Sequence, residues 1–533
     1  MGTATHTPAL SYWPADTSEE LLEQSVGDAL REAAAEAPDR LAIIEGTPGP
    51  GPRRQLTYAE LLTASEQAAQ ALLTRFRPGQ HVAVWAGNSL EWILLEYAAG
   101  LAGLVLVTVN PAYQAAELAY VLRQSRSVGL FHAASHRGNP MAEIMARVRD
   151  ELPELREVIA FEDWDEFVAD APTGTPLPVV APGDHIQIQY TSGTTGFPKG
   201  VLLNHRGLLN NARLVMRRLN AAPDDVAVSP TPLFHTTGCG MGVLGALTTR
   251  STLVYLTRFD PALQLELLES MRATITGGVP TMLIAILGHP DSHTRDLSSL
   301  RCVVSGGAPV PVEVARECER RFDVPFTIVF GTTECSPIIT QTKLDDSPQQ
   351  RTSTLGAGLP HTEVMITGSG TGRPVPIGEI GELCARGYLV MSGYYDNPEA
   401  TAAAVDVEGW YHTGDLASMT ADGCVRVEGR LTDMIVRGGE NVYPKEIEDL
   451  LQAHPAVAEV AVVGKPDDTW GETVAAFLRL NPGAEVTEAA LHAYCRDHLA
   501  AYKTPATWIF TDEFPLTASG KVRKNLLRAR LTD

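Results

Sequence analysis

Helix-like and strand-like patterns of apolar residues alternate over roughly the first four-fifths of the chain. Amphipathic spacing predicts helices, and short apolar runs bounded by polar residues predict strands. Strands separated by helices indicate parallel sheets covered by helices, so we expect an α/β fold. The predicted helices are residues 26–37, 58–76, 91–103, 117–123 and 141–151, and the predicted strands are 41–44, 81–85, 104–109, 128–131 and 186–190.

The pattern changes after about residue 415. An Asp-Gly pair at 422–423 lies between two short apolar runs, which is a strong hairpin signal. A helical pattern beginning at Pro444, two strand patterns and two further helices complete the chain. We predict a large N-terminal domain of helix-covered sheets at residues 1–429 and a small α+β C-terminal domain at 430–533.

Composition narrows the range of partners. The 533 residues are 44% hydrophobic and 20% charged, as in ordinary globular proteins. Lys and Arg number 42 and Asp and Glu number 64, and the resulting net charge of −22 argues against nucleic acid or an anionic membrane surface. The seven cysteines include no C-x-x-C pair, which favours reduced thiols over a disulfide or zinc framework.

The most apolar stretch, residues 92–109, contains Glu96, Gly100 and Gly103. This pattern is typical of a helix followed by a strand and not of a membrane span. The N-terminal residues show neither the pattern of a signal peptide nor a myristoylation motif. We expect no integral membrane segment and a cytoplasmic location.

A loop rich in glycine and hydroxyl residues follows the predicted strand at 186–190. Its sequence is YTSGTTGFPKGV at residues 190–201. Glycine lets backbone amides approach a ligand, and amides, hydroxyls and a lysine suit a polyphosphate. The common ATP-binding loop G-x-x-x-x-G-K-[ST] does not match, because Pro198 and Gly200 replace a glycine and a hydroxyl residue. A flexible linker is the alternative interpretation.

Seven further motifs follow in order. They are PLFH (232–235), SGGAP (305–309), FGTTE (330–334), YHTGD (411–415), GRLTD (429–433), RGGENVYP (437–444) and PLTASGK (515–521). Together with the loop at 190–201 they resemble the signature motifs of the adenylate-forming superfamily, which includes acyl-CoA synthetases. The resemblance implies that the small C-terminal domain is mobile and that the protein is an AMP-forming acid–CoA ligase using ATP, Mg²⁺ and CoA.

In the implied reaction a carboxylate oxygen attacks the α-phosphorus of ATP and pyrophosphate leaves. The acid is itself the nucleophile, so catalysis rests on positioning and charge compensation. By resemblance, Lys521 would hold the reacting carboxylate and phosphate, whereas without its motif it would be read as a surface lysine. Glu334 would bind Mg²⁺, and Thr333 would contact the α-phosphate.

The remaining ATP contacts follow from the same motifs. Asp415 can accept hydrogen bonds from both ribose hydroxyls with Arg430 as a helper, although an aspartate after Gly414 is also typical of a turn. Phe330 stands where the superfamily usually has tyrosine, so its ring can stack on adenine but lacks the hydroxyl. The predicted ATP-binding residues are Thr191, Ser192, Gly193, Thr194, Thr195, Lys199, Gly306, Gly307, Ala308, Phe330, Gly331, Thr332, Asp415 and Arg430.

The acid pocket is expected to begin at His235, although a histidine beside Phe234 is equally typical of a core position. The glycine-rich run after His235 predicts a wide pocket. These stretches contain no acidic residue that could bind an amine, which favours an apolar or aromatic carboxylic acid over an amino acid. The predicted pocket residues are His235, Thr237, Met241, Ser336, Pro337 and Ile338.

The loop matching residues 437–441 would line the tunnel for the pantetheine arm of CoA, and Lys503 would contact a phosphate. A plain hinge loop is the alternative for the segment around Lys503. The expected hinge position, usually Asp or Lys, is Thr432 here, and a β-branched residue predicts a stiffer hinge. The predicted CoA-binding residues are Arg437, Gly438, Gly439, Glu440 and Lys503.

Two other functions fit these motifs. One is an adenylate-forming enzyme that hands its acyl group to an acyl carrier protein or partner enzyme, and the other is a non-catalytic binding protein. The presence of Lys521, Glu334 and Asp415 argues against the non-catalytic protein. We therefore predict a ligase that makes an acyl-CoA, AMP and pyrophosphate from an acid, ATP and CoA. If the protein forms an oligomer, we expect a homodimer.

Overall fold

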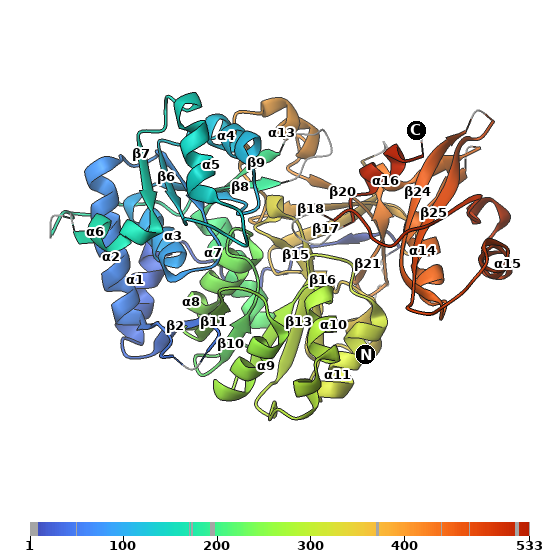
Figure 1. Ribbon diagram of the computed structural model, residues 1–533, viewed down its shortest axis with the longest axis horizontal. Coiled ribbons are helices and arrows are strands. Elements are labelled where there is room, and N and C mark those ends of the chain that lie inside the picture. Colours follow the sequence, from blue (N-terminus) through green and yellow to red (C-terminus); the bar gives the residue numbers. More distant parts are fainter. Residues whose placement is uncertain are drawn as a thin grey trace, which may run out of the picture. The chain divides into compact units, whose positions relative to one another are not determined.

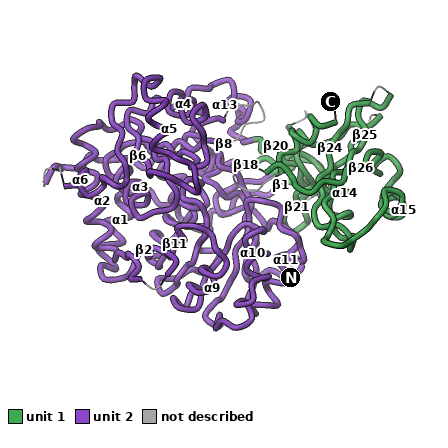
Figure 2. The backbone as a smooth tube through the Cα atoms, in the orientation of Figure 1, with its two compact units in different colours: residues 1–12, 365–384, 412–533 green, residues 13–364, 385–411 purple. Residues whose placement is uncertain are grey.

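The computed structural model describes residues 9–49, 51–169, 171, 174–191, 198–368, 372–438, 440–467, 469–516 and 522–531. Two compact units divide the chain and are coloured separately in Figure 2. Unit 1 comprises Met1–Tyr12, Met365–Cys384 and His412–Asp533, and unit 2 comprises Trp13–Val364 and Ala385–Tyr411. Helices and strands alternate along unit 2, and the predicted α/β fold class is confirmed (Figure 1).

The first sheet of unit 2 has nine strands among the described residues. Neighbouring strands are parallel from the third to the eighth position, and the edge strands are antiparallel. The spatial order is β16 (Ala357–Gly358), β15 (Ile338–Gln341), β14 (Phe326–Gly331), β13 (Cys302–Gly306), β12 (Ile275–Gly278), β10 (Val226–Ser229), β11 (Thr252–Leu256), β2 (Leu41–Gly46) and β3 (Gln55–Thr57).

Helices cover both faces of this sheet, which explains the continuous apolar runs of its strands. Val303 of β13 belongs to the core cluster formed with α9 (Pro261–Ser270), α10 (Pro280–Gly288) and α11 (Val312–Phe322). Its neighbours Cys302 and Val304 belong instead to a cluster with residues of α7 (His205–Arg218). Alternate residues of the strand therefore face two different cores.

The second sheet of unit 2 has seven strands within the described part of the chain. It is parallel from β8 to β7 and antiparallel at β9 and β19. Residues of α4 (Ala115–Gln124) and α5 (Met141–Val148) form one core cluster with it. The spatial order is β19 (Gly393–Tyr394), β9 (Lys199–Asn204), β8 (His185–Thr191), β5 (Val105–Val109), β4 (His81–Trp85), β6 (Gly129–His132) and β7 (Glu157–Ala160).

The N-terminal helices begin and end close to the predicted positions. They are α1 (Val26–Glu36), α2 (Tyr58–Arg75) and α3 (Leu90–Ala102). Ser25 and Thr57 form capping boxes with acidic residues three positions later, which satisfies the free amides of the first turns. Every residue of α3 except Glu91 is buried. No described helix combines the length and the apolar character needed to cross a membrane.

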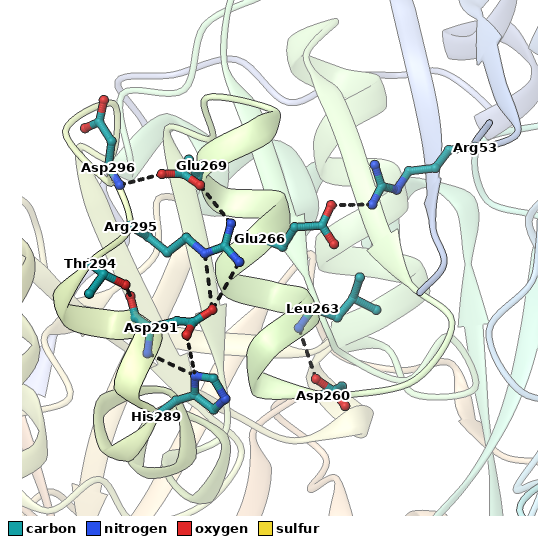
Figure 3. A network of polar contacts seen from close by, with 10 residues as sticks. All are labelled: Arg53, Asp260, Leu263, Glu266, Glu269, His289, Asp291, Thr294, Arg295 and Asp296. Carbon is teal, nitrogen blue, oxygen red and sulfur yellow. Dashed lines mark hydrogen bonds and ion pairs between the residues drawn. The ribbon is translucent and has the colours of Figure 1, made fainter. Parts of the chain in front are cut away.

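The other helical segments of unit 2 are short. A network of ion pairs joins one of them, η4, to α9 on the surface (Figure 3). These segments are α6 (Trp164–Ala169), α8 (Gly245–Thr249), α12 (Pro348–Ser353), α13 (Pro398–Ala404), the 3₁₀ turns η1 (Arg149–Glu151), η2 (Phe161–Asp163), η4 (Pro290–His293) and η5 (Thr333–Cys335), and the π-helix η3 (Thr237–Leu244).

Unit 1 contains most of a five-stranded sheet. Its described strands are, in order, β1 (Tyr12–Trp13), β17 (Thr362–Thr367), β18 (Gly381–Gly387), β20 (Tyr411–Met419) and β21 (Val425–Arg430). The antiparallel pairing of β20 and β21 confirms the hairpin predicted from the Asp-Gly pair at 422–423. Gly423 has a φ of +80°, as that turn requires.

The second sheet of unit 1 confirms the predicted α+β pattern of the C-terminal segment. Its described strands are β23 (Glu440–Val442), β22 (Ile435–Arg437), β25 (Gly471–Leu480) and β24 (Val457–Asp467), with β26 (Thr507–Phe510) beside β25. Alternate residues of β24 and β25 belong to separate core clusters, one with α14 (Pro444–Gln452) and α15 (Glu488–His498), the other with α16 (Lys524–Ala529). The 3₁₀ turns are η6 (Leu431–Asp433) and η7 (Ala501–Lys503).

Two hairpins were missed in the sequence. The loop predicted at 190–201 includes the beginning of β9, which returns antiparallel to β8. The loop predicted at 437–441 lies in the β22–β23 hairpin. Both strands that close these hairpins contain lysine, asparagine or glutamate, so their patterns lack the apolar alternation that marks a half-buried strand.

Candidate active site

The predicted phosphate loop joins β8 to β9. Thr191 and Lys199 are Cα partners across these antiparallel strands. A Cβ atom on Gly200 would lie only 2.8 Å from the Ile188 side chain, so the close packing of the two strands requires glycine. The two described ends of the loop are therefore opposite each other. Ser192, Gly193, Thr194 and Thr195 lie outside the described residues.

Lys199, Tyr394 and Glu334 form a group beside this loop. The Lys199 ammonium lies over the Tyr394 ring, 4.9 Å from its centroid. The Tyr394 hydroxyl donates a hydrogen bond of 2.9 Å to Glu334 Oε1. Burial raises the pKa of the Tyr394 phenol, and the Glu334 carboxylate raises it further, so the hydroxyl keeps its proton. The tyrosine thus links the predicted phosphate lysine to the predicted magnesium ligand.

Tyr394 was not among the predicted site residues. It lies in β19, which pairs with β9 so that Tyr394 is the Cα partner of Val201. Gly393 before it has a φ of +144°, and a Cβ there would meet the Thr401 side chain at 3.1 Å. The signal in the sequence was the Gly-Tyr pair at 393–394, but only the sheet pairing shows that it reaches Glu334.

Glu334 and Thr333 have the donor chemistry that Mg²⁺ requires. Both lie in the turn η5, which follows β14, and 7% of Glu334 is exposed. A carboxylate has two oxygens that can accept several bonds, so the contact from Tyr394 leaves capacity for a cation. Mg²⁺ is held by one or two carboxylates together with substrate phosphates. The two side chains present fit such an ion.

The predicted adenine slot lies at the carboxyl ends of two parallel strands. Gly306 ends β13 and is the Cα partner of Val329 in β14, which continues into Phe330, Gly331 and Thr332. A Cβ on Gly306 would lie 2.3 Å from the Val329 oxygen. Gly307 has a φ of +75°, and Ala308 follows it. Carboxyl ends of strands are where open α/β sheets bind ligands.

Asp415 and Arg430 are brought together in unit 1. They are Cα partners on β20 and β21, and Arg430 Nε lies 3.0 Å from Asp415 Oδ1. Asp415 is 5% exposed, whereas the Arg430 side chain is about half exposed. The pairing supports a shared role for these two residues.

Three of the predicted acid-pocket residues come from one segment and three from another. His235 lies in the turn before η3, and Thr237 and Met241 lie in η3. A Cβ on Gly240 of η3 would lie 4.0 Å from Pro337, and Met241 packs against the core cluster that contains Ile338. The Ser336 hydroxyl, however, donates to the Leu389 oxygen at 2.7 Å, so it is engaged within the protein.

A buried polar network that the sequence analysis missed contacts η3. Gln187 Nε2 donates to Glu96 Oε1 at 2.7 Å, and Gln189 Nε2 donates to Gln187 Oε1 at 2.7 Å and to Cys239 Sγ at 3.1 Å. Glu96 is fully buried, and this burial raises the pKa of its carboxyl to about 8. In the sequence, the sign of this buried network was a single glutamate, Glu96, within an otherwise apolar stretch.

The predicted CoA-binding residues surround one hairpin of unit 1. Arg437 and Glu440 are Cα partners on β22 and β23, and Gly438 has a φ of +61°. Arg437 Nη1 donates to the Tyr502 oxygen at 2.7 Å. Lys503 Nζ instead forms an ion pair with Glu446 at 2.7 Å. Gly439 lies outside the described residues.

Of the predicted hinge residue and the predicted catalytic lysine, only the hinge residue lies among the described residues. Thr432 lies in η6, and its oxygen accepts a hydrogen bond of 3.1 Å from Arg528 Nη2 of α16. The same guanidinium donates to Asp433 Oδ1 at 2.9 Å. Lys521 lies outside the described residues.

Comparisons with known proteins identify the family. A model of the AMP-binding enzyme family matches residues 30–395. The chain belongs to this family. The model of the AMP-binding enzyme C-terminal domain matches residues 446–521. The predicted membership of the adenylate-forming superfamily and the predicted class, an AMP-forming acid–CoA ligase, are confirmed.

Full-length relatives agree with this family. A putative acyl-CoA synthetase, YngI of Bacillus subtilis, is 40% identical and covers 96% of this chain and 98% of its own. The human mitochondrial medium-chain acyl-CoA ligase ACSF2 is 35% identical, and the match covers 98% of this chain and 90% of ACSF2. The ATP-bound structure of MatB from Rhodopseudomonas palustris has a TM-score of 0.87 and 29% identity, with 96% and 99% covered. The predicted use of ATP is supported by this AMP-binding family and this ATP-bound structure.

Proposed function

We propose that this AMP-binding enzyme converts an apolar or aromatic carboxylic acid into its CoA thioester in two steps. The acid's carboxylate oxygen attacks the α-phosphorus of ATP, pyrophosphate leaves, and an acyl adenylate forms. The thiol sulfur of CoA then attacks the acyl carbon, the thiol loses its proton, and AMP leaves. The alternative is transfer of the same acyl group to a carrier protein or partner enzyme.

The observation that carries this proposal is the group formed by Lys199, Tyr394 and Glu334 beside the β8–β9 hairpin. A cation and a carboxylate are held on either side of one phenol, at the end of a loop suited to phosphates. Mg²⁺ bound at Glu334 and Thr333 would offset charge on the phosphate oxygens. The protein's part is to hold these side chains in place before the nucleotide arrives.

The other proposed ATP contacts rest on the motifs that contain them. Gly306, Gly307 and Ala308 would contact adenine, and Phe330 would stack on it. Asp415 would accept hydrogen bonds from the ribose hydroxyls, and the Arg430 guanidinium would hold the aspartate in position. Lys521 would compensate charge at the reacting phosphate, a role that rests on its motif.

The apolar acid is favoured by the chemistry of the pocket segments. Residues 235–244 and 336–341 contain no acidic side chain, so an amine on the substrate would have no partner there. Met241 and Ile338 share an apolar cluster. The name of human ACSF2, a medium-chain acyl-CoA ligase, points to the same class of acid. Straight-chain acids of medium length are therefore the first substrates to test.

For the second step we propose that residues 430–533 move as one domain about Thr432. The β22–β23 hairpin, with Arg437, Gly438 and Glu440, would then guide the pantetheine arm, and Gly439 would leave room for it. Lys503, now paired with Glu446, could exchange this partner for a CoA phosphate. Arg528 holds the Thr432 oxygen and would have to release it if η6 rearranges.

Pyrophosphate exchange with a panel of acids tests the proposal. Medium straight-chain and aromatic monocarboxylic acids should support exchange, and amino acids should not. Met241→Trp should reduce the rate with the longer acids first, because it narrows the pocket. Ile284→Trp is the matched control, since Ile284 is 50% exposed and lies outside the predicted pocket. Exchange with amino acids, or equal effects of both variants, would contradict the assigned pocket.

The acceptor is tested separately by the release of AMP. With acid and ATP present, free CoA should accelerate AMP release and yield the thioester. Acceleration by an acyl carrier protein but not by CoA would establish the alternative.

A further inference from the structure

Three potential metal ligands converge in unit 1. Glu382 and Cys384 lie two residues apart on β18 and therefore share a face of that strand, and His412 lies on the neighbouring strand β20 (Figure 1). His412 Nδ1 is 3.4 Å from Cys384 Sγ and 2.9 Å from Glu382 Oε2. One donor atom from each residue lies within 4.8 Å of the other two.

One imidazole nitrogen faces both the sulfur and the carboxylate. A neutral imidazole nitrogen either donates or accepts a hydrogen bond, so His412 Nδ1 can serve only one of these two neighbours in each tautomer. The Cys384 sulfur also lies 3.9 Å from the Glu382 main-chain oxygen and 3.8 Å from the Thr367 hydroxyl. A cation placed among the three donor atoms would be attracted by each of them.

The set of donor atoms selects the ion. A thiolate, an imidazole and a carboxylate are the ligands of zinc, whereas Mg²⁺ and Ca²⁺ take oxygen ligands. A tetrahedral Zn²⁺ ion keeps its sulfur and nitrogen ligands roughly 3.5 Å apart and its nitrogen and oxygen ligands roughly 3.3 Å apart. The sulfur–nitrogen separation already matches, and the nitrogen–oxygen pair has to open by only a few tenths of an ångström.

Burial suits an ion with three protein ligands and one water. Cys384 is fully buried, which keeps its sulfur out of solvent. The side chains of His412 and Glu382 are 29% and 19% exposed, so an ion can reach them. We propose that Glu382, Cys384 and His412 form a binding site for Zn²⁺, with the fourth position taken by water.

The site lies beside the part of β20 that precedes Asp415. Glu382 Oε1 accepts a hydrogen bond of 3.1 Å from Gly414 N, while Oε2 is the oxygen nearest His412. The Thr413 hydroxyl donates to the Leu383 oxygen at 2.8 Å. An ion bound through Oε2 would therefore fix the carboxylate that also holds this part of β20. The two strands β18 and β20 become cross-linked at that point.

Cobalt provides a direct test, because a thiolate bound to Co²⁺ gives an intense near-ultraviolet charge-transfer band. The full chain, stripped of metal with a chelator, is titrated with Co²⁺ and then with Zn²⁺. We expect the band to saturate at one Co²⁺ per chain and to disappear when Zn²⁺ replaces it. Absence of the band would overturn the proposal.

Variants assign the ligands. Cys384→Ser should abolish the band, and His412→Asn or Glu382→Gln should weaken Co²⁺ binding by at least about 100-fold, since loss of an outer-sphere partner alone costs 10–100-fold. Cys424→Ser is the matched control, because Cys424 is a buried cysteine of the same sheet region with an aspartate nearby. A band that survives Cys384→Ser, or is lost equally in Cys424→Ser, overturns the assignment.

Thermal unfolding separates metal binding from folding. Zn²⁺ should raise the melting temperature of the native chain and of Cys424→Ser, because a ligand that binds only the folded state stabilises it. The metal-free Cys384→Ser protein should melt as the metal-free native protein does and should show no rise with Zn²⁺. An equal rise in Cys384→Ser contradicts the site.

Discussion

Glu334 and Glu96 are both buried carboxyl groups of unit 2, with 7% and 0% of the residue exposed. Each accepts a hydrogen bond from a neutral side chain, Tyr394 in one case and Gln187 in the other. Their wider surroundings differ. Glu334 lies at the end of a strand beside Lys199, where magnesium and ATP are proposed to bind, whereas Glu96 lies within α3 beside amides. A buried carboxyl can therefore be prepared for a cation or kept neutral by a proton, and its neighbours decide which.

Replacing each carboxylate with a carboxamide distinguishes the role of Glu334 from that of Glu96. Glu334→Gln removes the charge proposed to hold Mg²⁺, and we expect pyrophosphate exchange to fall by about 10²–10³-fold. Glu96→Gln keeps the shape and the neutral character of Glu96, so exchange at pH 7 should change by less than about threefold. Similar losses in both variants would break the distinction.

The proton on Glu96 predicts a pH dependence of stability. Burial raises the pKa of this carboxyl from 4.5 to about 8, so folding favours its protonated form. Its contribution to stability is present below about pH 4.5 and is lost as the pH rises through about 8. Between these values the free energy of unfolding should fall by up to about 1.4 kcal/mol per pH unit.

Urea unfolding at several pH values measures this contribution. The difference between the native protein and Glu96→Gln, which does not titrate, should shrink or reverse as the pH approaches 8. A difference that stays constant across this range would show that Glu96 is not protonated in the folded protein.

Tyr394→Phe tests the contact that positions Glu334. The ring that packs against Lys199 remains, but the hydrogen bond to the carboxylate is lost. Hydrogen bonds to charged groups contribute about 1.5–3 kcal/mol, so we expect pyrophosphate exchange to fall by roughly 10–100-fold. Tyr395→Phe is the matched control at the next position. Equal activity of both variants would show that Tyr394 only packs.

The exposed network in Figure 3 should give the smallest effect. Glu269 pairs with Arg295 at 2.9 Å, and Arg295 also contacts Asp291 at 3.0 Å. The Arg295 and Glu269 side chains are about a third exposed, so water and salt screen the pair. Glu269→Gln should leave both pyrophosphate exchange and the unfolding midpoint within experimental error. A clear loss of stability would place this network alongside the buried carboxyl groups.

Local patterns predicted the fold well because they act over a few residues. Capping residues, amphipathic spacing and the Asp-Gly turn each specify a structure within one element. The β9 strand was missed because its pairing with β8 depends on partners in the sheet and not on its own pattern. The same limit explains Tyr394, which reaches Glu334 across 60 residues of sequence.

The site was predicted through motifs and not through physical contacts. Motifs named Glu334, Lys199 and the pair Asp415 and Arg430, and the structure shows what each described side chain touches. The absence of a C-x-x-C pair had argued against a zinc framework, whereas Cys384 and His412, which are 28 residues apart, meet only because β18 and β20 pair. Contacts between strands carry information that a linear motif does not contain.

The register of β8 and β9 has a consequence for the entropy of nucleotide binding. Bringing the ends of a loop together lowers the conformational entropy of the chain, by an amount that grows with the logarithm of loop length. Here Thr191 and Lys199 are paired within a seven-stranded sheet, so this conformational entropy is lost when the sheet folds and not when the nucleotide binds. ATP bound at this loop, as proposed, would meet two loop ends that are already held in place, and more of its contact energy would remain for affinity.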